Sequence, residues 1–259
     1  MELAEVMLLV LSVGVVAGVP AYIYFRNSMV KKQSGKEDYS QKRVIKLTSI
    51  NLLLNSVVAG FFFVIFSNLL QRATLLSLDV IIFALLFVFM TCLTFYGNGI
   101  YITSIVLESY TLPQLRKISY FKNQFIAIRL FHGPISHILV YSGWMWAMFM
   151  LVPLSLAGEP VSSLPLLIFA LGGGIVGAAY AGAQIYYGTS AYQLISGVLI
   201  LILTLSIMIT SHPRFASPIP VFLTSFISIF SSIIIARLLS LHFSKKKFTW
   251  YENTTENNS

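Results

Sequence analysis

The chain has 259 residues, of which 57% are hydrophobic and only 10% are charged. Soluble domains carry about 25% charged residues, so this composition excludes an ordinary water-soluble protein. The net charge of +8 does not indicate a nucleic-acid partner, because the basic residues lie in short connections between apolar segments, where positive charge sets membrane orientation.

Apolar segments of about 20 residues recur along the chain and predict an all-α, polytopic membrane protein. A transmembrane β-barrel fits less well, because its strands would alternate apolar and polar residues. We expect one bundle of seven transmembrane helices over residues 1–244, followed by a polar cytoplasmic tail at 245–259. The expected helices are roughly 3–25, 47–70, 80–107, 130–154, 164–187, 192–211 and 217–241.

The first segment differs from a signal peptide in its charge. It begins with Glu2 and Glu5, and positive charge follows it only at Arg26. A signal peptide would carry a basic region in front of its apolar stretch. We therefore expect a retained helix whose N-terminus lies outside.

The basic residues divide unequally between the two sides of the predicted membrane. Fifteen of the 17 lysines and arginines lie in the regions 26–46, 108–129 and 237–247, and only Arg72 and Arg214 lie on the other side. Cytoplasmic loops are enriched in such residues. The split predicts an outside N-terminus, a cytoplasmic C-terminus and an odd number of crossings. Two Asn-x-Ser/Thr sequons in the tail argue for the opposite side, but an asparagine-rich tail produces them by chance.

Polar residues inside the apolar segments gather in the predicted cytoplasmic half. A polar side chain without a partner is costly in hydrocarbon, so this distribution is informative. It predicts a polar cavity open to the cytoplasm; the alternative is a set of hydrogen bonds that join helices. The candidate binding residues are Asn51, Asn55, Asn98, Tyr101, Glu108, Arg129, His132, His137 and Gln184.

Two of these candidates, His132 and His137, lie in the fourth segment on either side of Pro134. Residues five apart are about 140° apart on a regular helix, so the two histidines are expected on different faces. Proline removes a backbone donor and can kink the helix between them. His137 shares a face with Tyr141 and is expected in a packed aromatic stripe, bonded to a neighbour. A haem or metal role for the two histidines is an alternative that no matched histidine spacing supports.

Glycines mark two further segments. Gly173 and Gly177 form a GxxxG pattern within the small-residue run 172–182. Such a face lets another helix approach closely, whether that helix belongs to this chain, to a second copy or to another membrane protein. The alternative is a flexible hinge or a backbone that lines a substrate path. In the third segment, Gly97 and Gly99 flank Asn98 and predict an irregular helix.

These features favour a non-enzymatic membrane protein in the lipid bilayer, either a small transporter-like component or a subunit of a membrane complex. No lysine lies deep in a segment, which excludes a retinal Schiff base. One alternative is a receptor or sensor that signals through the loop 108–129. Another is a redox subunit or intramembrane enzyme that uses His132 and His137.

Overall fold

The computed structural model describes residues 3–18, 41–73, 77–115, 122–157, 165–210 and 217–243, and the elements in these ranges are helices. Two of the helices, η1 and η3, are π-helical, with wider turns than an α-helix. In chain order the elements are α1 (Leu3–Leu9), η1 (Val10–Ala17), α3 (Gln41–Arg72), α4 (Leu78–Leu115), α5 (Lys122–Leu130), η3 (Phe131–Ile135), α6 (Ser136–Leu156), α7 (Leu166–Tyr187), α8 (Ser190–Thr210) and α9 (Pro218–Phe243).

Six helical spans in the described ranges are long and apolar enough to cross a membrane. They correspond to the second through seventh predicted segments, so the all-helical class is confirmed, and six of the predicted segments are helices of membrane-spanning length and apolarity. The first predicted segment contributes a shorter apolar helix, Leu3–Val15, and its predicted residues 19–25 lie outside the described ranges. The six spans are Thr48–Arg72, Leu78–Leu107, Ile126–Leu156, Leu166–Ile185, Ser190–Thr210 and Pro218–Phe243.

The helices around the predicted loop 108–129 are longer than the sequence indicated. Helix α4 continues to Leu115 and α5 already begins at Lys122, so the prediction of a loop over that whole range is wrong. Hydropathy marks only the part of a helix that suits lipid, and the helix itself continues into polar sequence. With 38 residues, α4 is about 57 Å long, well beyond the roughly 30 Å of a hydrocarbon core.

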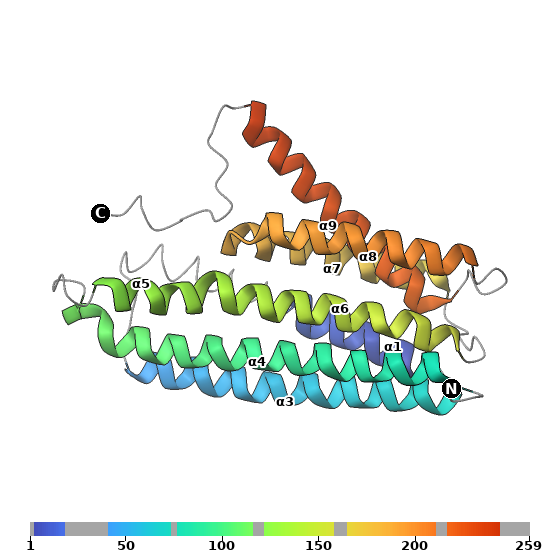
Figure 1. Cartoon of the computed structure of the whole chain (residues 1–259), viewed down its shortest axis with the longest axis horizontal. Helices are drawn as coiled ribbons and strands as arrows, with labels where there is room; N and C mark the ends of the chain where they lie inside the picture. The colour runs from blue at the N-terminus through green and yellow to red at the C-terminus, as the bar shows by residue number, and fades with distance from the viewer. Residues whose placement is uncertain are drawn as a thin grey trace.

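The six long helices alternate in direction, which gives the bundle two ends (Figure 1). At one end α3 begins, α4 ends and α5 begins; we call it the basic end, because Lys42, Arg43 and Lys46 lie in the first turns of α3. We call the opposite end, where α3 ends at Arg72, the Arg72 end.

Helix α6 occupies the middle of the bundle. Figure 1 shows it between the α3–α4 pair and the group of α7, α8 and α9, while the last turns of α9 project away from the other helices. Thirteen of the 21 residues of α6 are buried, whereas the buried hydrophobic residues described in α3 are Phe62, Ile65 and Leu69. The most extensive contacts join α4 to α6 and α7 to α9, and α1 with η1 lies against α3 and α7.

The outer surface of the bundle is apolar. Large hydrophobic side chains point outward from the spanning helices, among them Leu53 (70% exposed), Leu85 (66%) and Leu167 (67%). Contiguous apolar surface of this kind is rare on a soluble monomer. Together with the six spans, it is compatible with a multi-pass integral membrane protein whose outer face contacts lipid.

Candidate functional site

The candidate site lies where α4 and α6 approach most closely, and glycine permits the approach. A Cβ atom on Gly97 of α4 would lie 2.8 Å from Leu139 Cβ and 2.8 Å from Val140 N. On α6, a Cβ on Gly143 would lie 2.6 Å from Thr94 Oγ1 and 2.9 Å from Thr94 N. The helix α4 runs through Gly97 and Gly99 without a break, so the predicted irregularity is wrong: Gly97 serves close packing.

Just before α6, the helix widens into the π-helical turn η3 around Pro134. Proline has no N–H group and cannot complete the α-helical ladder. Two side chains bond to carbonyls within this turn. Ser136 Oγ donates to the His132 carbonyl at 2.6 Å, and His137 Nδ1 lies 2.6 Å from the Gly133 carbonyl. A carbonyl only accepts, so Nδ1 carries the proton in this contact.

The π-helical turn brings His132 and His137 to one common neighbour. Both imidazole ring centroids lie 5.3 Å from the ring centroid of Tyr101 on α4. The prediction that the two histidines occupy separate faces assumed a regular helix and is wrong. A turn with i to i+5 hydrogen bonds holds more residues than an α-helical turn, so residues five apart come closer to alignment.

From His137 a row of aromatic rings in contact continues toward the Arg72 end, and the predicted aromatic stripe is confirmed. His137 stacks on Tyr141 at 6.1 Å, and Tyr141 meets Tyr180 of α7 edge to face at 5.2 Å. Trp144 then stacks on Tyr180 at 5.7 Å and contacts Phe226 of α9 at 5.3 Å. The row therefore links α6 to both α7 and α9.

A hydrogen-bond network beside this row joins α6, α7 and α8. Gln193 is fully buried; its Oε1 accepts from Tyr180 Oη at 3.1 Å, and its Nε2 donates to Ser142 Oγ at 3.0 Å. Tyr180 Oη also approaches the Tyr141 carbonyl at 3.0 Å. None of these residues was among the sequence candidates. A glutamine near the start of an apolar helix is the signal in the sequence from which this network could have been found.

The asparagine candidates form a pair on neighbouring helices. Asn98 Nδ2 of α4 donates to Asn55 Oδ1 of α3 at 3.0 Å, and both side chains are half-buried. This bond satisfies one polar group of each residue in an apolar surrounding. Asn51 and Glu108 lie in α3 and α4, but their side chains are outside the described part of the structure.

The remaining candidates lie apart from the Asn55–Asn98 pair. Gln184 is fully buried at the end of α7, where its Oε1 accepts a hydrogen bond from Thr189 Oγ1 across the turn to α8. Gly188 makes that turn with a φ of 71°, a conformation that favours glycine.

Arg129 is half-buried in α5, one turn before His132. Direct contacts among the described candidates thus form two groups, the Asn55–Asn98 pair and the larger group of Tyr101, His132 and His137.

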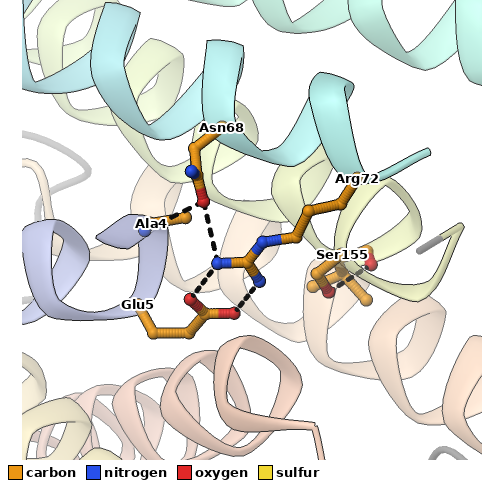
Figure 2. Close-up of polar contacts among 6 residues, drawn as sticks. Ala4, Glu5, Asn68, Arg72 and Ser155 are labelled. Atoms are coloured by element: carbon orange, nitrogen blue, oxygen red, sulfur yellow. Dashed lines mark hydrogen bonds and ion pairs between the residues drawn. The ribbon is translucent and has the colours of Figure 1, made fainter. Parts of the chain in front are cut away.

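A second polar cluster, at the Arg72 end, had no counterpart among the candidates. Arg72 forms a two-pronged ion pair with Glu5, through Nη1 to Oε1 at 2.6 Å and Nη2 to Oε2 at 2.8 Å (Figure 2). Asn68 Oδ1 accepts from Arg72 Nη2 at 2.8 Å and from the Ala4 amide at 3.3 Å. The pair is largely buried, with 4% of the Glu5 side chain and 15% of the Arg72 side chain exposed. It fixes the start of α1 to the end of α3.

The chemistry available at the Tyr101–His132–His137 cluster is proton exchange and hydrogen bonding. With Nδ1 held by Gly133, the Nε2 atom of a neutral His137 is the nitrogen that accepts a proton. Among the described residues, no group of three or more His, Cys, Asp or Glu side chains could hold a metal ion. A haem role for either histidine stays the less favoured alternative from the sequence.

Comparisons of the chain with protein-family models, with curated proteins and with solved structures found no match.

Proposed function

We propose that the chain crosses the membrane seven times, with its N-terminus outside and its C-terminus in the cytoplasm. The Glu5–Arg72 ion pair supports this arrangement, because it holds the start of α1 at the end of the bundle where α3 stops. Helix α1 then runs antiparallel to α3, as a first crossing would. The excess of lysine and arginine at the basic end assigns that end to the cytoplasm.

Within this arrangement, the proposed function is that of a small transporter-like membrane component that handles protons or a polar solute at the Tyr101–His132–His137 cluster. The observation that carries the proposal is the convergence of two histidines and a tyrosine from two spanning helices on one contact. Ionisable residues in membrane segments are rare and mark ion pathways and proton relays.

The depth of the cluster supports access from the cytoplasmic side. Tyr101 follows the start of α4 at Leu78 by 23 residues, which is about 35 Å of helix. His137 precedes the end of α6 at Leu156 by 19 residues, or about 28 Å. For a hydrocarbon core of about 30 Å, both lie near the boundary at the basic end. A solute or proton would reach them without crossing the apolar half of the bundle.

Proton flux into vesicles tests this function. Purified protein would be reconstituted with a pH-sensitive dye inside, and a potassium diffusion potential would drive protons inward. The intact protein should carry protons faster than protein-free vesicles, and His132→Ala or His137→Ala should reduce the rate to that background. Size-exclusion chromatography would check that each variant remains folded.

The matched control is His242→Ala, which removes an exposed histidine near the end of α9 and should leave the flux unchanged. Flux equal to protein-free vesicles in the unaltered protein would contradict proton handling. Flux that persists in both histidine variants would contradict the assignment to this cluster.

A further inference from the structure

We propose that Ser136 is a positioning residue whose hydroxyl holds the π-helical turn η3 and thereby keeps His132 against Tyr101. This inference deepens the proposed function and rests on it for its biological meaning. Its geometry stands on separate observations: the hydrogen bonds of Ser136, its burial and the ring contacts of the two histidines.

The first observation concerns the two hydrogen-bond donors of Ser136, its backbone amide and its hydroxyl, which donate to different carbonyls. In an α-helix the Ser136 amide would donate to the carbonyl four residues earlier, that of His132. Here the amide donates to the carbonyls of Phe131 and Gly133. The hydroxyl of the same residue donates to the His132 carbonyl at 2.6 Å. The side chain of Ser136 therefore donates to the His132 carbonyl, to which the Ser136 amide would donate in a regular α-helix.

The second observation is the burial of this bond. Ser136 has no exposed surface, and the neighbouring Pro134 is also buried. The donor side of the bond is closed to water, and a backbone carbonyl that loses a donor in a membrane segment is destabilised. Loss of the hydroxyl would therefore favour return of the turn to α-helical bonding, where the amide serves the His132 carbonyl again.

The third observation is what the turn does to the histidines. Ser136 Oγ also lies 3.4 Å from His137 Nδ1, but the shorter contact of this nitrogen is with the Gly133 carbonyl at 2.6 Å, and the His137 ring stacks on Tyr141. We therefore expect His137 to move less than His132. His132 lies on the far side of the π-helical turn and is half-buried. An α-helical turn would return the two rings to about 140° of separation, and His132 would lose its contact with Tyr101. Ser136 thus acts on the cluster through His132.

Histidine side-chain NMR of the full-length protein in detergent micelles tests the proposal. The chain has four histidines, so each resonance can be assigned by a single substitution. The Tyr101 ring should displace the His132 resonances through its ring current, and Tyr101→Leu should remove that displacement. Ser136→Ala should also remove it, while the His137 resonances change less and those of His242 stay fixed.

Two further variants separate the hydrogen bond from simple packing. Ser136→Thr keeps a hydroxyl that bonds four residues back, so it should restore the His132 displacement. Ser206→Ala removes an equivalent bond, from Ser206 Oγ to the Ile202 carbonyl at 2.8 Å, in the regular helix α8, and should leave all four histidines unchanged. An unchanged His132 in Ser136→Ala, or a failure of Ser136→Thr to restore it, would overturn the proposal.

If Ser136→Ala does not fold, Ser136→Cys replaces it, because a thiol is a weak donor of similar size. The displacement of His132 should then be smaller than in Ser136→Thr; equal displacement in the two variants would overturn the proposal. The resonances report geometry and require no transport. A protein without proton flux would contradict the proposed function alone, whereas an undisturbed His132 contradicts the positioning role alone.

Discussion

At the scale of single residues, some buried polar groups of this bundle find a specific partner, whereas others, such as Trp144 Nε1 and Thr204 Oγ1, have no hydrogen-bond partner among the described residues. Glu5 and Arg72 neutralise one another and Arg72 also donates to Asn68, while Asn55 and Asn98 bond directly. A buried ion pair adds little net stability compared with apolar residues of the same size, but removal of one partner leaves an uncompensated charge. The Glu5–Arg72 pair therefore makes α1 dependent on α3.

Glu5→Gln should destabilise the protein strongly, because Arg72 would stay buried without its counter-charge. The expected loss is about 3–5 kcal/mol in the free energy of unfolding, measured by thermal unfolding in detergent. Asp79→Asn is the matched control, since Asp79 is exposed at the start of α4, near the same end of the bundle. Equal unfolding temperatures for the two variants would show that the ion pair does not hold α1 in place.

At the scale of elements, glycine decides which helices approach most closely. On α7, the Cβ position of Gly173 is occupied by the Phe222 carbonyl, and that of Gly177 by the Phe226 carbonyl, both in α9. The predicted close-packing face is thus confirmed, and α9 of the same chain covers it at these two positions. Gly97 and Gly143 serve the same purpose between α4 and α6. Without a hydrophobic effect between helices in lipid, such close contact is a main source of packing energy.

Gly173→Ala should separate α7 from α9, because the new methyl group would overlap with the Phe222 backbone, which cannot rotate away. We expect a loss of about 1–3 kcal/mol, the usual cost of overpacking, seen as a lower unfolding temperature. Gly182→Ala is the control on the same helix, since a Cβ there meets nothing within 4 Å. That variant should be neutral or slightly stabilising, because alanine favours helix more than glycine does.

At the scale of the whole molecule, the bundle has an apolar outer surface and two chemically different ends. The basic end carries the helix extensions and lies closer to the Tyr101–His132–His137 cluster, while the Arg72 end carries the single buried ion pair of the described residues. A membrane protein with this asymmetry inserts in one direction, which the positive-inside rule assigns. Orientation is therefore a property of the whole chain and can be tested without knowledge of a substrate.

Cysteine labelling in intact cells should report the proposed orientation. In a Cys92→Ser background, Asp79→Cys and Lys46→Cys place one exposed thiol near each end of the bundle. A membrane-impermeant maleimide should label Asp79→Cys in intact cells and Lys46→Cys only after lysis. The reverse pattern would invert the orientation, and labelling of both or neither in intact cells would contradict the separation of the two ends.

The sequence by itself determined the all-helical class, the approximate position of six spanning helices, the basic end and the close-packing role of Gly173 and Gly177. These properties depend on local hydropathy, on charge between apolar segments and on the size of single residues, all of which are visible without a fold. Sequence also identified Asn55, Asn98 and the two histidines as polar residues that would need partners.

Only the tertiary structure decided which residues are the partners of these polar side chains. The Glu5–Arg72 pair joins residues 67 apart, and the bond between Gln193 and Ser142 joins residues 51 apart, so both depend on which helices become neighbours. His132 and His137 both contact Tyr101 because of the π-helical turn η3. A prediction that assumes the 3.6-residue period of a regular α-helix does not contain such a turn. Hydropathy specifies that a segment is helical, but the direction of each polar side chain is set by packing and by the local hydrogen-bond register.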